Sequence, residues 1–372
     1  MQARLNSFSL ALRCFWLWLL HGAAIKKVTP KSIVIVQFGK LGDMVCTTPM
    51  FRAIKKHDPT TRIIVVGDKV GGEVLAGNTD VDRYIVCGTD STEALTELKK
   101  EKPDAAVIAS PSLRAFALLY LANIRTIVAP RVVGGVSMES RLYKLLAHLG
   151  VQVEHRMGQY APREYLKALE PIGIAAEDTT KHLAYTAQAA AQVEEYIGPH
   201  ASARLVGISP AAGNRIKQWP PERFAAVANH LAGRGFVIVV LGGKNDAKEV
   251  AAMLAELKPE TKVLNLADKI SIDELKALMQ HLSLFISVDT GPIYIAEAFG
   301  VPTIDIVGPV DEREQPPIGE KHVVVVPKRT KPELYVMNPY PKDPTEARRQ
   351  TESITAQEII EAADALLDQL QL

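Results

Sequence analysis

Runs of valine and isoleucine, unbroken by polar residues, alternate along this chain with amphipathic stretches, and this alternation most limits the folds available to it. Such runs predict strands buried on both faces of a parallel sheet, because a half-exposed strand would alternate apolar and polar residues. We expect strands at 33–38, 62–67, 83–87, 105–109 and 126–129, interleaved with helices at 44–56, 70–76, 92–100 and 112–121. This order implies right-handed crossovers and an open α/β sheet.

The rhythm breaks between residues 132 and 185, where polar helical stretches precede a linker. A second series then has strands at 205–209, 236–241, 262–265, 284–287, 303–307 and 322–326, and helices at 221–232, 246–257, 272–281, 292–299 and 356–370. A chain of 372 residues is too long for one ordinary core. We therefore predict two Rossmann-like domains, 28–185 and 186–372, that face a central cleft. The final helix could also pack back on the first domain.

The first 27 residues differ from the rest of the chain. Residues 8–20 are nearly all apolar, but Arg13 interrupts a run that is already short for a spanning helix. An amphipathic helix lying on a membrane surface fits this pattern best, with Trp16 and Trp18 at headgroup depth. A signal-like or spanning segment, or a helix packed on its own protein, remains an alternative.

Composition excludes some classes of function. The net charge is +1, so the chain lacks the general positive field of a non-specific nucleic-acid-binding protein. Its three cysteines, Cys14, Cys46 and Cys87, lie far apart, which disfavours a disulfide framework or a zinc site. A reducing cytoplasm is the simplest setting.

The first candidate motif is 38–43, Phe-Gly-Lys-Leu-Gly-Asp, at a strand-to-helix turn. Ligands of open α/β sheets bind beyond the carboxyl ends of the strands. Gly39 and Gly42 would let the backbone turn tightly and approach a ligand. Asp43 could accept a proton as a general base, or it could only cap the helix.

Two further motifs occupy matching turns of the second half. Residues 209–220 contain Ser209, Arg215 and Lys217 among small residues, and the two cations suit phosphate groups. Residues 287–292 contain Asp289, Thr290 and Gly291 at a helix start, where free N–H groups favour an anion. Together they predict a nucleotide diphosphate site, although solvated charges and a plain helix cap would explain single residues.

These motifs resemble those of glycosyltransferase family 9, the family of the lipopolysaccharide heptosyltransferases. The likeness rests on Leu-Gly-Asp at 41–43, Thr-Thr-Pro at 47–49, Gly-Asn-Thr-Asp-Val-Asp at 77–82, residues 209–219, and 289–309 with Gly-Val-Pro-Thr at 300–303 and Gly-Pro at 308–309. It covers nearly the whole chain after residue 30, with the motifs in order.

The resemblance implies a GT-B fold and an inverting transfer of a heptose from an ADP-sugar, with no metal or other cofactor. It implies that Asp43 is the base, that Lys217 contacts the donor phosphates, and that Asp289, Thr290 and Gly291 hold the donor. It also places Asp246 at the ribose. One position departs from the family, since Tyr294 stands where a histidine is common. Tyrosine carries no positive charge near pH 7, so the donor sugar stays open.

The segment 131–158 interrupts the predicted sheet rhythm and gathers Arg131, Arg141, Lys144, His155 and Arg156. It is the best candidate for a surface that binds a phosphorylated, lipid-linked acceptor, although a solvated helix face would look the same. The Asp80-Val81-Asp82 pair suits a turn better than a metal site.

The favoured function is therefore a glycosyltransferase on the cytoplasmic face of the inner membrane, acting on a lipopolysaccharide-core or related acceptor. A different donor sugar or acceptor, or an idle nucleotide-sugar binding protein, are the alternatives; the joint presence of Asp43, Lys217 and Asp289 argues against the second. A Rossmann-type epimerase or dehydrogenase is disfavoured because no GxGxxG motif occurs.

Overall fold

The computed structural model describes residues 12–16, 30–137 and 139–372 and divides the chain into two compact units, 1–182 and 183–372. Most of the predicted amino-terminal membrane helix lies outside the described residues. Of that segment, residues 12–16 are helical, with Cys14 buried and Leu12, Phe15 and Trp16 exposed. No helix of the described residues is both long enough and apolar enough to cross a bilayer.

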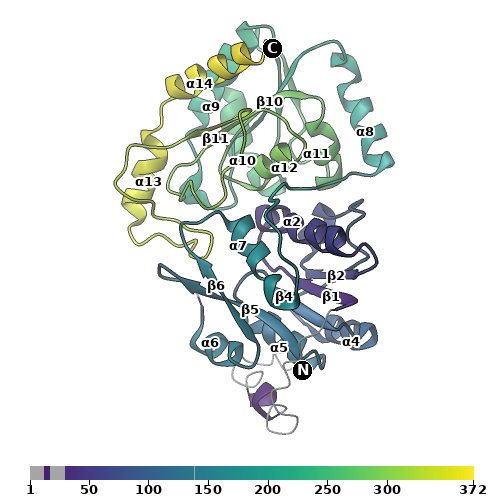
Figure 1. Ribbon diagram of the computed structural model, residues 1–372. Coiled ribbons are helices and arrows are strands. Elements are labelled where there is room, and N and C mark those ends of the chain that lie inside the picture. The colour runs from purple at the N-terminus through teal and green to yellow at the C-terminus, as the bar shows by residue number, and fades with distance from the viewer. Residues whose placement is uncertain (1–11, 17–29, 138) are drawn as a thin grey trace, which may run out of the picture. The chain divides into compact units, whose positions relative to one another are not determined.

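Within its described residues, the first unit has a parallel sheet in the order β3-β2-β1-β4-β5-β6 (Figure 1). Its strands are β1 (Ser32–Val36), β2 (Arg62–Gly67), β3 (Arg83–Val86), β4 (Ala105–Ile108), β5 (Thr126–Val133) and β6 (Val151–Arg156). The connecting helices are α2 (Leu41–His57), α3 (Lys69–Val74), α4 (Thr92–Glu101), α5 (Leu113–Leu121), α6 (Arg141–Ala147) and α7 (Ala161–Lys167). The order reverses between β1 and β4, which makes their carboxyl ends the expected ligand site.

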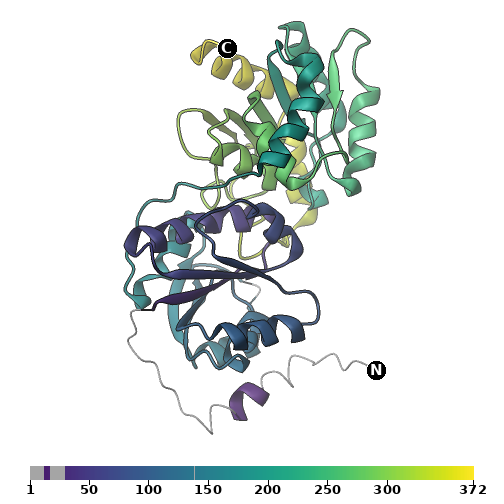
Figure 2. The ribbon, with the colours of Figure 1, turned by 90° about the vertical axis from the view of Figure 1, so that its right-hand side faces the viewer.

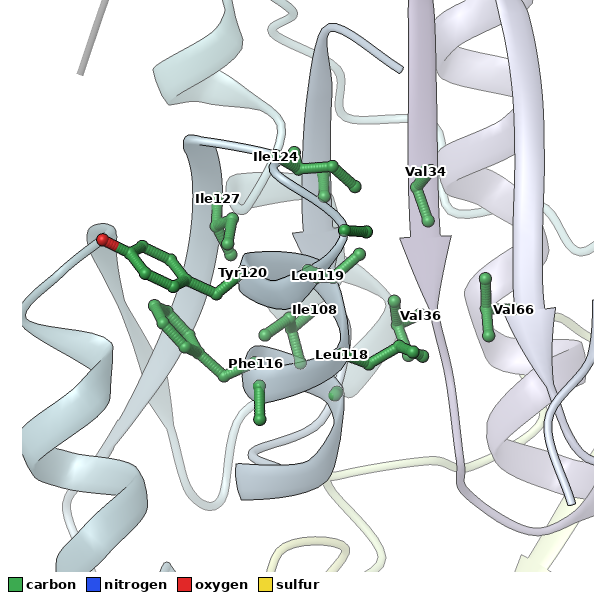
Figure 3. Close-up of a cluster of buried hydrophobic side chains, with 14 of the residues drawn as sticks. Val34, Val36, Val66, Ile108, Phe116, Leu118, Leu119, Tyr120, Ile124 and Ile127 are labelled. Carbon is green, nitrogen blue, oxygen red and sulfur yellow. The ribbon is translucent and has the colours of Figure 1, made fainter. Parts of the chain in front are cut away.

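Helices cover both faces of this sheet. In Figure 2 the purple helix α2 lies on one face, and the blue helices α4 and α5 lie on the other. Figure 3 shows the core on the α5 side, where Leu118 lies close to Val36 and Phe116 lies beside Tyr120. The central strands β1, β2 and β4 are therefore buried on both sides, as their apolar runs predict.

The second unit repeats the same topology, in the order β12-β11-β10-β7-β8-β9 with all described pairs parallel. Its strands are β7 (Leu205–Ser209), β8 (Val237–Val240), β9 (Val263–Asn265), β10 (Leu282–Val288), β11 (Thr303–Ile306) and β12 (His322–Val325). Its helices are α8 (Ala187–Ile197), α9 (Pro221–Gly233), α10 (Ala247–Ala255), α11 (Ile272–Met279), α12 (Gly291–Ala298), α13 (Pro344–Ser353) and α14 (Ala356–Gln369), with 3-10 turns η3 (Arg215–Lys217) and η4 (Lys244–Asp246). Here the order reverses between β7 and β10.

Three elements differ from the sequence-based predictions. The first sheet does not end before the segment 131–158, because β5 continues to Val133 and a further strand, β6, pairs with it along 151–156. That strand carries polar residues at the sheet edge and so lacks a Val/Ile run. Helices α8 and α13 are also present where no helix was predicted. The last helix, α14, places its buried apolar residues in the core of the second unit.

Candidate active site

The loop after β1 is shaped by a buried glutamine. Gln37 donates from Nε2 to Thr47 Oγ1 at 3.0 Å, and its Oε1 accepts the N–H of Gly39 at 2.9 Å. Thr47 in turn donates to the carbonyl of Asp43 at 2.7 Å. This network fixes the first turn of α2 against the end of β1, at the point where the strand order of the first unit reverses.

Asp43 lies in the first turn of α2 and is partly exposed. Its Oδ2 accepts the backbone N–H of Lys40 at 2.8 Å, so the predicted helix-capping role is present. Capping and proton transfer are compatible, because a carboxylate has two oxygens and about four acceptor positions. Whether Asp43 acts as a base stays a prediction that the fold permits.

The structure gives Gly39 a steric role in addition to the one predicted. A Cβ added there would lie 2.5 Å from both Cβ and Oδ2 of Asp43, so only glycine leaves room for that carboxylate. The positive φ angles in the described chain occur elsewhere. Gly42 is buried within the first turn of α2.

In the second unit, Lys217 and Asp289 come together from separate loops. Strands β7 and β10 are neighbours, with Ser209 and Ser287 in register, so the loops that follow them meet at one edge of the sheet. Lys217 Nζ lies 2.7 Å from Asp289 Oδ2, and both side chains are largely buried. Ser209 is buried at the end of β7, whereas Arg215 is exposed at the start of η3.

Asp289 has a second donor on its other oxygen. The hydroxyl of Tyr294, buried on α12, donates to Asp289 Oδ1. Thr290 is the N-cap residue of α12, but among the described residues its side chain makes no capping hydrogen bond. Gly291 opens the helix. The Thr290 side chain therefore does not cap α12. The anion site predicted at this helix start stays a prediction.

A buried carboxyl that sequence reasoning missed lies behind this pair. Asp305 on β11 is fully buried, and its Oδ1 has no hydrogen-bond partner among the described residues. Burial, and then the negative charge of Asp289, raises the pKa of Asp305 well above its ordinary value. Both effects favour the uncharged form of the side chain. An aspartate within the apolar run 303–307 was the signal that could have identified it.

Asp246 lies at the end of η4, after β8, and is partly buried. Its Oδ2 accepts the N–H of Gly243 at 2.7 Å, which fixes the turn. This hydrogen bond does not test the predicted contact of Asp246 with a ribose, which stays a prediction.

The predicted basic segment is less positive than the sequence indicated. Arg131 and Arg156 both pair with Glu154, at 2.6 and 2.9 Å, and Lys144 lies 3.5 Å from Glu139. Arg141 is exposed at the start of α6. The prediction that His155 adds to the charge is wrong, because burial lowers the pKa of His155 to about 4 and keeps the ring neutral.

The Asp-Val-Asp turn at 80–82 is engaged in ion pairs. Asp80 pairs with Arg52 at 3.0 Å and Asp82 with Lys55 at 2.7 Å, so both carboxylates tie the turn to α2. Within the described part of the chain, no group of three or more histidine, cysteine, aspartate or glutamate side chains could hold a metal ion.

The family follows from the comparison with known proteins. A family model described as glycosyltransferase family 9 (heptosyltransferase) matches residues 97–342, which is more than half of the chain. The chain belongs to glycosyltransferase family 9. It is therefore a glycosyltransferase, and the predicted family is confirmed. The lipopolysaccharide heptosyltransferase 3 of Escherichia coli is 25% identical over an alignment of 289 residues, and this alignment covers 73% of this chain and 81% of that protein.

Solved structures share the fold. A family 9 glycosyltransferase from Veillonella parvula has a TM-score of 0.76 at 22% identity and covers 91% of this chain and 97% of its own. An E. coli heptosyltransferase with ADP-2-deoxy-2-fluoro heptose has a TM-score of 0.63 at 18% identity, with 90% and 99% covered. The predicted α/β fold of GT-B type with two Rossmann-like halves is thus confirmed.

Proposed function

We propose that this glycosyltransferase moves a heptose from ADP-heptose to a lipopolysaccharide-core or related acceptor. The observation that carries the proposal is the meeting of Lys217, Asp289 and Tyr294 beside the start of α12, at the reversal point of the second sheet. A relative named as a lipopolysaccharide heptosyltransferase and a structural neighbour with an ADP-heptose analogue support this choice of donor and acceptor.

In this proposal the second unit binds the donor. The Lys217 ammonium and the free N–H groups of Thr290 and Gly291 would neutralise the diphosphate. Asp289 would hold Lys217 in place through their 2.7 Å ion pair, and Tyr294 would orient Asp289 from α12. Ser209, at the end of β7, is a further proposed donor contact, as are Arg215 and Asp246 on the loops after β7 and β8.

Asp43 is the proposed base. It would take the proton of the acceptor hydroxyl as that oxygen attacks the anomeric carbon of the heptose. The bond from this carbon to the phosphate oxygen breaks on the opposite face, and ADP leaves with the electron pair, so the configuration inverts. Positive charge at the donor site would stabilise the leaving group without a metal.

We place the acceptor on the first unit and the enzyme at the inner face of the inner membrane. Leu12, Phe15 and Trp16 expose their apolar side chains while Cys14 is buried in the core, which fits a short helix that offers one face to lipid. Arg141, exposed at the start of α6, is the strongest remaining candidate for a phosphate of the acceptor, with Arg131, Lys144 and Arg156 beside acidic partners.

The test measures transfer from ADP-heptose, UDP-sugars and GDP-sugars to core-lipid acceptors in the presence of a chelator. Asp43→Asn should lower kcat by about 10²- to 10⁴-fold, because it removes the base. Asp68→Asn is the matched control, since Asp68 also follows a strand and accepts a helix N–H, at 2.8 Å to Gly71. It should keep full activity, and the product should have the anomeric configuration opposite to that of the donor.

Each outcome has a definite meaning. Transfer only from another nucleotide sugar would keep the mechanism and replace the heptose, with Tyr294 as the first residue to examine. Transfer that stops when the metal is chelated would remove the metal-free mechanism. Binding of ADP without turnover of any donor would favour an idle nucleotide-sugar binding protein.

A further inference from the structure

The turn that carries Lys217 is short and needs contacts with other parts of the second unit to stay in place. Turn η3 has only three residues. Its internal support consists of backbone hydrogen bonds from Lys217 and Gln218 to Asn214 and Arg215, and of the Asn214 side chain, which accepts the N–H of Ile216 at 3.3 Å. A three-residue turn is marginal by itself. Something else must therefore fix the lysine whose ammonium pairs with Asp289.

That support comes from α13, a helix about 130 residues later in the sequence (yellow in Figure 1). The carbonyl groups immediately before and after Lys217 are both held by side chains of this helix. Thr351 Oγ1 donates to the carbonyl of Ile216 at 2.8 Å, and Arg348 Nη1 donates to that of Gln218 at 2.6 Å. The Thr351 hydroxyl also lies 3.3 Å from the carbonyl of Ala347 in its own helix.

Helix α13 is itself firmly placed. Its N-cap residue Asp343 accepts the N–H groups of Thr345 and Glu346 at 2.9 and 3.1 Å. At the other end, the buried indole of Trp219 donates to the carbonyl of Ile354 at 2.8 Å. Arg223 of α9 also donates to the carbonyl of Glu352 at 2.6 Å, so the positions of Thr351 and Arg348 do not depend on the Lys217 turn alone.

Thr351 also touches the loop after β11. A Cβ added at Gly308 would lie 3.0 Å from Thr351 Oγ1, and Gly308 has a φ of +58°. One buried side chain thus contacts the Lys217 turn and the 308–309 turn together. Arg329 donates to the carbonyl of Gly308 at 2.7 Å, so the 308–309 turn is held by a second side chain as well.

We propose that Thr351 and Arg348 are positioning residues of the donor site, which hold the Lys217 turn so that its ammonium meets the donor diphosphate. This inference rests on the proposed role of Lys217. Neither residue needs to touch the donor, because each acts on a carbonyl next to Lys217. Loss of either hydrogen bond should weaken ADP binding about five- to tenfold, as expected for one well-made hydrogen bond.

The experiment measures the Kd of ADP by calorimetry for Thr351→Val and Arg348→Ala of the full chain. Thr351→Ser keeps the hydroxyl and should bind ADP within about twofold of the wild type. Arg349→Ala is the matched control, because Arg349 is the next residue of the same helix but pairs only with Glu346 among the described contacts. It should leave the Kd unchanged.

The same variants in a Lys217→Ala background separate positioning from general damage. If the two residues act through Lys217, neither should weaken ADP binding further there. Equal losses in both backgrounds, or an equal loss in Arg349→Ala, would overturn the inference. If Lys217→Ala weakens binding while Thr351→Val and Arg348→Ala do not, only the inference fails. If Lys217→Ala itself leaves the Kd unchanged, the proposed donor site is wrong as well.

Discussion

Replacing Gly39 by alanine should displace the carboxylate of Asp43 without changing residue 43 itself. The added Cβ would lie 2.5 Å from Asp43 Oδ2, while ordinary contact begins near 3.4 Å, so the carboxylate must move by about 1 Å. No positive φ obstructs the substitution. The shift breaks the 2.8 Å hydrogen bond from Lys40, at a cost of about 1 kcal/mol, or about 2–4 °C in Tm.

The effect on catalysis should be far larger than the effect on stability. A displacement of about 1 Å at a reacting group can lower kcat about 10²-fold. The rate of ADP release from ADP-heptose with acceptor measures kcat, and the KM for the donor should stay unchanged, because the donor belongs to the second unit in our proposal. Gly233→Ala is the control, since an added Cβ there meets nothing within 4 Å.

A kcat within about threefold of the wild type would refute the reasoning, because the Asp43 carboxylate would then not be needed where the structure has it. The double variant Gly39→Ala with Asp43→Asn should be no slower than Asp43→Asn alone. An additional loss would show that Gly39 acts on something other than the carboxylate.

Three further predictions follow from side chains described above. Because the folded-state pKa of His155 is about 4, against an ordinary value of 6.5, the unfolded chain gains a proton there first as the pH falls. Urea unfolding should therefore show that His155 accounts for about 2 kcal/mol of lost stability between pH 7.5 and 5, a loss that His155→Gln removes. For Asp305 the sign is opposite, since its raised pKa keeps a proton on the folded state that the unfolded chain releases above about pH 4. Asp305→Asn should thus gain more Tm over the wild type at pH 8 than at pH 5. Tyr294→Phe, which removes the donor to Asp289, should raise the KM for the donor about five- to tenfold in the transfer assay.

Each has a result that contradicts it. A pH-dependence of unfolding unaltered by His155→Gln, with the exposed His148→Gln as control, would mean that the buried ring does not stay neutral. A Tm difference for Asp305→Asn that is constant with pH would mean that Asp305 does not hold a raised pKa. An unchanged donor KM in Tyr294→Phe would remove Tyr294 from the donor site.

The sequence predicted best where one physical pattern dominates. Strand β2 was predicted with its observed bounds, because RIIVVG is a short run rich in β-branched residues, which favours a strand buried on both faces. Strand β6, VQVEHR, has no such run, since an edge strand needs only part of its surface covered. Helix α13 is strongly polar, yet Asp343, Pro344 and Glu346 form a start signal that could have revealed it.

Local sequence alone determined the alternation of strands and helices, the strand-end loops and the residue types placed on them. These depend on hydrophobic periodicity and turn chemistry, which act over a few residues. Tertiary structure alone decided which of those residues meet. The pairing of Lys217 with Asp289 joins segments 72 residues apart, and the hydrogen bond from Thr351 to the Ile216 carbonyl joins segments 135 residues apart. Asp305 lies buried behind the Lys217–Asp289 pair. Such contacts depend on the register of neighbouring strands and on how the layers of the fold pack. Both involve segments far apart in the sequence, so no single stretch of sequence determines them.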